Sequence, residues 1–188
     1  MKLTKQNIGA VLFIGTAQFL LFMIIAEALY PGYSTSANYI SDLGVGSTAV
    51  IFNCSMVIFG VLAAVSGYYL FFIFKDKIFA GLMVLAGLGA VMVGLFPETT
   101  GIPHYIGAIM VFFLGALAAI YSYKVLKTPF AWLSVILGLI SLLALAHIVM
   151  QTDYGLGVGG IERMIAYPII IWTLGLGAYL MASNSKKK

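Results

Sequence analysis

Charged side chains are scarce in this sequence. Asp, Glu, Lys and Arg together make up 9% of its 188 residues, whereas about 25% is usual for a soluble domain. Hydrophobic residues make up 62% of the chain, and the mean hydropathy is +1.08. So many apolar side chains cannot all be buried in one soluble core, and most must face lipid or one another. The composition therefore predicts an integral membrane protein.

Cysteine and histidine are also rare. The single cysteine, Cys54, lies inside an apolar run, which excludes an intramolecular disulfide and leaves the redox compartment open. The two histidines, His104 and His147, are far apart in the sequence and form no HExxH motif. The net charge of +4 comes from short lysine clusters between hydrophobic runs. A membrane topology signal explains this pattern without any nucleic-acid partner.

The sequence contains many apolar runs that are about long enough to cross a membrane. A bilayer core of about 30 Å requires about 20 apolar residues in a helix. The runs are continuously apolar, without the alternation of a barrel strand, so we expect helices. No linker or break in composition divides them, which predicts one domain over residues 1–188: an all-α bundle of six transmembrane helices at about 8–30, 49–74, 78–96, 105–123, 130–150 and 164–182.

The lysines predict the orientation of this bundle. With six spans, all nine lysines fall on one side: Lys2, Lys5, Lys75, Lys77, Lys124, Lys127, Lys186, Lys187 and Lys188. The positive-inside rule makes that side cytoplasmic, with both termini, in a multi-pass protein of the cell membrane. The outer side then carries one basic residue, Arg163, and five of the six acidic residues: Glu27, Asp42, Glu98, Asp153 and Glu162.

The outer connections are longer and richer in polar residues than the cytoplasmic ones. In "PGYSTSANYISDLGVGST", Ser36 or Ala37 can begin a short helix that ends at Gly44. The segment "GLGVGG" matches the spacing of a dinucleotide fingerprint, but it follows a membrane helix rather than a strand, so that function is disfavoured. We interpret its glycines as backbone that lets the loop pack against helix ends, with a nest for an anion as the alternative.

Three segments resemble the membrane family known as domain of unknown function 998. They are "NYISDLG", "LFPETTGIPHYIGA" and "GIERMIAYPIIIW", and they occur in order over nearly the whole chain. The resemblance implies a fold of six helices, and it names no activity. The residues that it implies as a shared pattern are Ser41, Asp42, Leu43, Gly44, Pro97, His104, Glu162 and Arg163.

These polar residues are the candidate site. We expect a ligand-binding cavity that opens outward and involves Asn38, Ser41, Asp42, Glu98, His104, Asp153, Glu162 and Arg163. Acid–base chemistry would fall to Asp42, Glu98 and His104. A divalent metal could be held by His104, His147 and Asp42, and a haem by the two imidazoles. Glu27, near the outer end of the first span, is a further candidate because ionisable residues at that depth are costly.

Arg163 carries the most specific expectation. Because the sixth span is predicted to begin at 164, Glu162 would sit at a helix N-terminus, where the macrodipole favours a negative charge. The same dipole disfavours Arg163, which is therefore expected to reach Asp42 or Glu98 and to keep part of its guanidinium for a ligand anion. The alternative is that Arg163 extends to a lipid phosphate.

Three classes of function remain open. The first is binding of a lipid headgroup or another amphiphile, with Arg163 as the anion contact and membrane lipid as the partner. The second is a membrane-embedded hydrolase or transferase, with or without a metal, that acts on lipid. The third is a noncatalytic or haem-binding subunit of a membrane complex, or a homo-oligomer. No row of ionisable residues crosses the membrane interior, which disfavours a channel or pump.

Overall fold

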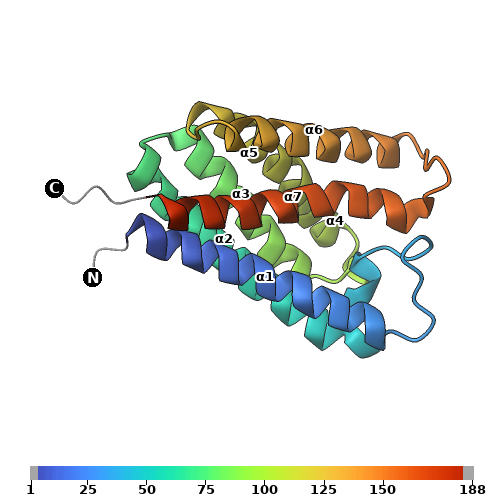
Figure 1. Ribbon diagram of the computed structural model, residues 1–188. Coiled ribbons are helices and arrows are strands. Elements are labelled where there is room, and N and C mark those ends of the chain that lie inside the picture. The colour runs from blue at the N-terminus through green and yellow to red at the C-terminus, as the bar shows by residue number, and fades with distance from the viewer. Residues whose placement is uncertain (1–3, 184–188) are drawn as a thin grey trace.

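The computed structural model describes residues 4–183, which contain helices and turns but no strand. Six segments of this part of the chain are long and apolar enough to cross a membrane (Figure 1). The predicted all-α, six-span fold is therefore confirmed. The helices are α1 (Lys5–Leu29), α2 (Ala49–Phe74), α3 (Lys77–Leu95), α4 (Ile102–Ile109), α5 (Gly115–Tyr121), α6 (Phe130–Val149) and α7 (Gly157–Ala182).

Short polar residues set the ends of several helices. The Thr4 side chain accepts a hydrogen bond from the Asn7 amide at the start of α1, and the Asp76 side chain accepts one from the Phe79 amide at the start of α3. Such caps satisfy amides that have no partner within the helix. Lys75 adopts a left-handed conformation (φ 59°) that ends α2, so α2 and α3 form a tight hairpin.

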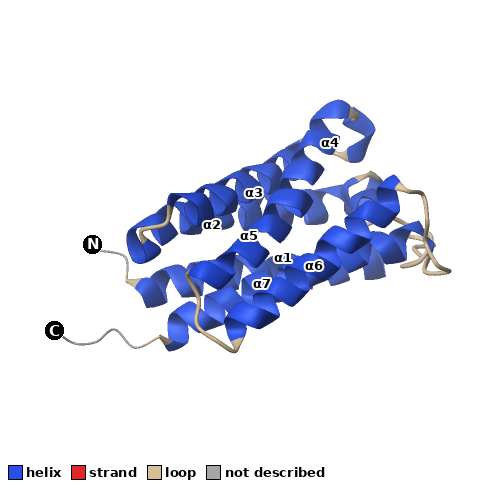
Figure 2. Cartoon of the chain, turned by 90° about the horizontal axis from the view of Figure 1, so that it is seen from above, coloured by secondary structure: helices blue, strands red, loops and turns tan. Residues whose placement is uncertain are grey.

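The helices form a ring in which neighbours in sequence pack together and α1 closes against α7 (Figures 1 and 2). The Gln6 side-chain amide donates to the Ser183 carbonyl at 2.8 Å, which fixes the start of α1 to the end of α7. The closest packing joins α2 and α3. A Cβ on Gly60 would lie 2.7 Å from the Gly87 carbonyl, so the two backbones touch where both residues are glycine.

The fourth span is not a regular helix. It begins with α4, continues through a π-helical turn (Met110–Leu114) and α5, and ends in a 3₁₀ turn (Ser122–Lys124). In the ring, α4 and the π-helical turn pack mainly on α3, whereas α5 packs mainly on α6. The ring is consequently less closely packed between α4 and α6 at the end where α4 begins.

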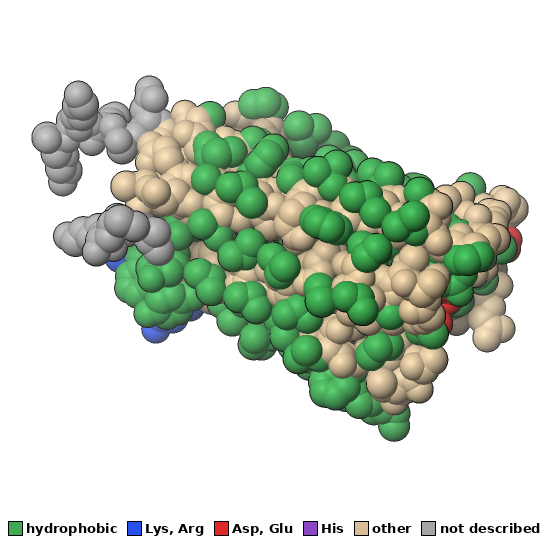
Figure 3. Space-filling model, turned by 90° about the horizontal axis from the view of Figure 1, so that it is seen from below, with side chains coloured by type: hydrophobic (Ala, Val, Ile, Leu, Met, Phe, Trp, Pro, Cys, Tyr) green, Lys and Arg blue, Asp and Glu red, His purple; other side chains and the backbone are tan. Residues whose placement is uncertain are grey.

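The two ends of the bundle differ in charge. The flank is hydrophobic, with basic side chains visible at one end and acidic side chains at the other (Figure 3). We call the end formed by residues 30–48, 96–101 and 150–156 the acidic end. Lys5, Lys75, Lys77, Lys124 and Lys127 lie at the opposite end, as predicted, whereas Lys2, Lys186, Lys187 and Lys188 lie outside the described residues.

The structure corrects several boundaries at the acidic end. Helix α7 begins at Gly157 rather than at 164, and α4 begins at Ile102 rather than at 105. The short helix expected in the first connection is reduced to two 3₁₀ turns, Ser41–Gly44 and Gly46–Thr48. A third 3₁₀ turn spans Glu98–Thr100. The early start of α7 matters most, because it places Glu162 and Arg163 inside the helix rather than at its end.

Candidate functional site

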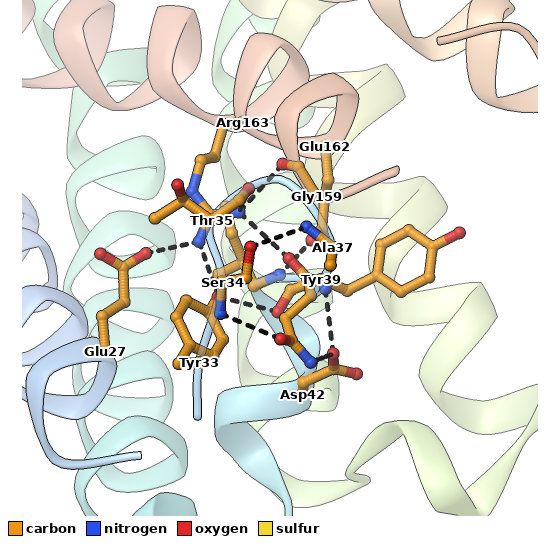
Figure 4. Close-up of polar contacts among 12 residues, drawn as sticks. Glu27, Tyr33, Ser34, Thr35, Ala37, Tyr39, Asp42, Gly159, Glu162 and Arg163 are labelled. Atoms are coloured by element: carbon orange, nitrogen blue, oxygen red, sulfur yellow. Dashed lines mark hydrogen bonds and ion pairs between the residues drawn. The ribbon is translucent and has the colours of Figure 1, made fainter. Parts of the chain in front are cut away.

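Arg163 is the centre of a closed polar network at the acidic end (Figure 4). One terminal nitrogen, Nη2, lies 2.6 Å from the Glu27 carboxylate and 2.6 Å from the Tyr33 hydroxyl. The other, Nη1, donates to the backbone carbonyls of Thr35 at 2.8 Å, Gly159 at 2.9 Å and Asn38 at 3.2 Å. Both charged side chains are largely buried, at 8% exposed for Arg163 and 17% for Glu27. We call Arg163 and these five partners the arginine hub.

Tyr33 extends the arginine hub into the first connection. Its hydroxyl accepts from Arg163 and donates to the Tyr39 carbonyl at 2.9 Å. Burial raises the pKa of Tyr33 to about 12, so the hydroxyl keeps its proton at neutral pH. The guanidinium carbon also lies 5.5 Å from the centre of the Tyr33 ring, within the range of a cation–π contact.

Glycines at the start of α7 let the first connection approach this closely. The Gly159 amide donates to the Ser36 carbonyl at 2.9 Å. A Cβ on Gly159 would collide with the Asn38 carbonyl, and one on Gly157, whose φ is +75°, would collide with the Ser36 carbonyl. The glycines thus allow close packing at a helix end, but they lie in α7 itself and the segment that packs on them is the first connection, rather than the loop that was expected to contain them.

The expected partner of Arg163 was wrong. It pairs with Glu27 of α1, and not with Asp42 or Glu98. Because α7 starts at Gly157, Arg163 lies in the second helical turn, where it faces α1 and the first connection. Both terminal nitrogens bond to protein atoms, and the remaining nitrogen, Nε, is buried without a partner. The expected role of Arg163 as an anion contact is therefore not supported by its geometry.

Glu162 points toward a different place, because successive side chains on an α-helix diverge by about 100°. It is 7% exposed, and its Oε2 accepts a hydrogen bond from the Ile40 amide. It also lines a cavity of about 420 Å³ that lies between the first connection, α4, α6 and α7. The lining residues are Tyr39, Ser41, Glu98, His104, Tyr105, Ala108, Ile109, Phe112, Leu145, Ile148, Glu162 and Ile165. We call it the acidic cavity.

The Glu98 carboxyl, which lines the acidic cavity, has the Asp42 carboxyl as a close neighbour. The Ser41 hydroxyl donates to Glu98 Oε2 at 2.8 Å. Asp42 is held in turn by the Asn38 side-chain amide at 2.9 Å and the Tyr39 amide at 3.0 Å. Burial, and then the neighbouring Asp42 carboxyl, raise the pKa of Glu98. Glu98 therefore keeps its proton to a higher pH than an isolated glutamate does.

His104 presents an acceptor to the acidic cavity. Its Nδ1 lies 2.8 Å from the Phe96 carbonyl, which can only accept, so Nδ1 carries a proton. In the neutral form of the ring, Nε2 is then the acceptor. The side chain is 5% exposed and lines the cavity, and no residue in the described range 4–183 donates to Nε2. This histidine is therefore positioned to accept a proton or a hydrogen bond from a ligand.

A narrow apolar hollow of about 50 Å³ continues from the acidic cavity into the bundle. The two share Ser41, His104, Ala108, Phe112 and Glu162 as lining residues. The inner hollow is otherwise surrounded by aromatic and aliphatic side chains of four helices, among them Phe19, Met23, Phe52, Met56, Phe59, Val93 and Ile169. Polarity thus falls from the rim inward.

The predicted site residues divide into three groups. Ser41, Glu98, His104 and Glu162 line the acidic cavity. Asn38, Asp42 and Arg163 do not line it. They are joined to one another by hydrogen bonds beside the cavity, from Asn38 to Asp42 and from Arg163 to the Asn38 carbonyl. Asp153 lies with His147 in a separate hollow of about 320 Å³, where its carboxylate accepts from the Gly155 amide. The single cavity that was expected to join Asp42, His104 and Arg163 is therefore corrected to a cavity and an adjoining hub.

A metal or haem centre gains no support from the arrangement. Within the described range, no three His, Cys, Asp or Glu side chains are grouped closely enough to hold a metal ion. His104, His147 and Asp42 are consequently not brought together as a ligand set. The two histidines line different hollows, which also argues against a shared haem between them.

Sequence reasoning missed three tyrosines. Tyr39 and Tyr105 line the acidic cavity, and Tyr33 belongs to the arginine hub. Burial and the nearby carboxylates of Glu162, Asp42 and Glu98 raise the pKa of Tyr39. The sequence did contain a usable signal for these residues. All three lie in or beside the polar connections, and tyrosine is enriched at the interfaces between membrane and water.

The comparisons with known proteins agree with this architecture. The family described as "Protein of unknown function (DUF998)" matches residues 13–179. The chain therefore belongs to that family, as its motifs suggested. Searches of curated proteins and of solved structures found no match.

Proposed function

We propose that this member of the DUF998 family binds a membrane amphiphile. The polar head of the amphiphile lies in the acidic cavity, and its tail lies between α4 and α6. The observation that carries the proposal is the graded lining of the cavity. Carboxyl, imidazole and hydroxyl groups form its inner wall, whereas Ile109, Leu145 and Ile148 form the side between the two helices. An amphiphile matches such a surface, because its two parts prefer the two kinds of lining.

The lateral side of the acidic cavity gives the ligand a route from the bilayer. Tyr105 and Ile109 line the cavity and are also 62% and 58% exposed on the bundle surface. Both lie in the first two turns of α4, within about 10 Å of the helix start at 1.5 Å per residue. That depth is where lipid head groups meet the acyl region. A ligand could therefore enter sideways, without passing through water.

The acidic end is proposed to face outward. The described lysines lie at the opposite end of the bundle, and the positive-inside rule would make that end cytoplasmic. In a chain whose Cys54 is replaced by Ser, single cysteines at Ser36 and Thr100 should react with an impermeant maleimide on intact cells. A cysteine at Lys127 should react only after the membrane is opened. The reverse pattern would invert the proposed orientation.

The binding proposal is tested by filling the cavity. Ala108 lines both the acidic cavity and the inner hollow, so Ala108→Phe places a ring inside them. Ala146→Phe is the matched control, since Ala146 is exposed on α6 and lines none of the cavities described above. Native mass spectrometry of protein purified in a nonionic detergent should show a retained amphiphile in the wild type and the control, and loss of it in Ala108→Phe. Equal adducts in all three would refute the proposal.

A further inference from the structure

Three side chains present hydrogen-bond acceptors to the acidic cavity: Glu98, His104 and Glu162. His104 Nε2 has no donor among residues 4–183, since Nδ1 already donates to Phe96. Glu162 uses one carboxylate oxygen for the Ile40 amide, and no described residue donates to the other. The Ser41 hydroxyl is directed at Glu98, and the remaining hydroxyl donors of the lining belong to Tyr39 and Tyr105. A ligand that donates hydrogen bonds can therefore pair with the free acceptors of His104 and Glu162.

The acidic cavity also has no basic side chain in its lining. Its lining residues, all from the described part of the chain, include two glutamates and neither lysine nor arginine. The nearest guanidinium, Arg163, is paired with Glu27 in the arginine hub and has no free terminal donor. The described lysines lie at the other end of the bundle. A cationic head group in this site would therefore meet two carboxyl groups and no competing cation among the lining residues.

We infer that the head group bound in the acidic cavity carries a primary ammonium, which donates to Glu98, Glu162 and His104 Nε2. This assignment rests on the proposed function and specifies its substrate class as cationic single- or double-tailed amphiphiles. An ammonium supplies three N–H donors and one positive charge. It thereby matches both the unpaired acceptors and the uncompensated carboxylates.

Three other head groups fit less well. A phosphate brings negative charge to a site that has carboxylates and no cation to receive it. A trimethylammonium has the right charge but no N–H, so His104 and Glu162 would stay unpaired. A sugar has hydroxyl donors but leaves the carboxylates without a counter-charge. Each of these head groups can be tested as a probe that carries the same hydrocarbon tail.

The experiment compares four probes with a hexadecyl tail: hexadecylamine, hexadecyltrimethylammonium, hexadecyl phosphate and hexadecyl glucoside. Each is titrated into the purified protein in a nonionic detergent, and specific binding is the part that Ala108→Phe removes. We expect hexadecylamine to bind at least about tenfold more tightly than the other three, because one charged hydrogen bond is worth about that factor. Preference for any of the other three, or equal binding of the amine and trimethylammonium probes, would overturn the assignment.

Variants of the carboxylates separate charge from shape. Glu98→Gln should weaken hexadecylamine binding about tenfold and leave hexadecyl glucoside unchanged. Glu98→Lys should reverse the preference, so that hexadecyl phosphate binds in place of the amine. Glu98 lies on a short exposed turn, so both variants should fold, which a thermal unfolding midpoint near that of the wild type would verify. Unchanged amine binding in both folded variants would refute the inference.

The same data distinguish failure of this inference from failure of the proposed function. If a different probe binds and Ala108→Phe abolishes that binding, the cavity is an amphiphile site and only the ammonium assignment is wrong. If no probe binds in a way that depends on Ala108, the amphiphile proposal itself is refuted.

Discussion

The arginine hub and the acidic cavity lie side by side at one end of the bundle, and they differ in how far their polar groups are paired within the protein. In the hub, Arg163 bonds to five protein acceptors from α1, the first connection and α7. In the cavity, His104 and Glu162 keep acceptor positions that no described residue fills. The two sites begin at adjacent residues of α7, whose side chains diverge by about 100°.

The difference separates a structural role from the proposed binding role. A buried network in which both terminal nitrogens of the arginine are bonded holds its members in place and leaves no terminal donor for a ligand. Acceptors around a hollow that no described residue fills are the opposite arrangement, because a ligand can donate to them. Under the proposed function, Arg163 therefore stabilises the fold and the adjacent Glu162 contacts the ligand.

The largest expected effect comes from breaking the arginine hub. Glu27→Gln leaves Arg163 buried without its counter-charge, and Arg163→Lys cannot reproduce the guanidinium contacts to three segments. Glu27→Gln should lower the free energy of unfolding by about 3–5 kcal/mol, the usual cost of removing one partner from a buried pair. Arg163→Lys keeps the charge and should lower it by a smaller amount, because it loses hydrogen bonds only. Unfolding in mixed detergent micelles, followed by circular dichroism, measures this.

The matched control for the hub variants is Glu98→Gln, which removes a carboxyl of the acidic cavity. It should change the free energy of unfolding by less than about 1 kcal/mol, as surface substitutions usually do. Equal destabilisation by Glu27→Gln and Glu98→Gln would show that the contrast between a closed hub and an open cavity is false.

A smaller effect is expected from separating the first connection from α7. Gly159→Ala places a methyl group against the Asn38 and Thr35 carbonyls, both of which accept a hydrogen bond from Arg163. Overpacking of this kind costs about 1–3 kcal/mol. Gly81→Ala in α3 is the control, because a Cβ there meets nothing within 4 Å and alanine favours a helix. The same unfolding assay should show a loss for the first variant and none for the second.

The smallest effect concerns pH and belongs to the acidic cavity. The pKa of Glu98 is raised in the folded state, so the folded protein binds this proton more tightly than the unfolded chain does. Its stabilising contribution is present below the ordinary glutamate pKa of about 4.3 and is lost as pH rises through the higher folded value. Acidification from neutral pH should thus stabilise the wild type more than Glu98→Gln.

The control for the pH comparison is a variant of a carboxyl group that lies at the acidic end but outside the cavity wall. Asp153→Asn provides it, since Asp153 is an exposed residue whose carboxylate bonds only within its own turn. This variant should keep the pH response of the wild type. Parallel stability curves for the wild type and Glu98→Gln would contradict the raised pKa of Glu98.

The transmembrane spans could be predicted from the sequence because their signal is local. Length and continuous apolarity identify a helix that crosses a bilayer, and α2 has the predicted bounds, 49–74. The start of α7 could not be predicted in the same way. The three glycines of "GVGG" disfavour a helix, yet this segment is helical and packs closely against the Ser36 and Asn38 carbonyls.

The partner of Arg163 depended on that missed boundary. With the helix assumed to begin at 164, Asp42 and Glu98 were the nearest carboxylates in the polar connections. Two additional turns of helix direct Arg163 toward α1, where Glu27 had been noted only as a costly buried acid. The gathering of Ser41, Glu98, His104 and Glu162 was anticipated, because loops at one end of a small bundle have little room to stay apart.

The π-helical turn Met110–Leu114 also acts as a change of register within one span. Each π turn holds one more residue than an α turn, so α4 and α5 can be rotated independently of each other. His104 and Ala108 can thereby face the acidic cavity while Gly115 and Ala119 are buried in the packing of the ring. Deleting one residue of the turn, such as the exposed Phe113, would restore a continuous α-helix and turn α4 by about 100° relative to α5. A single-codon deletion would then remove His104 from the cavity wall without altering any of the polar residues themselves.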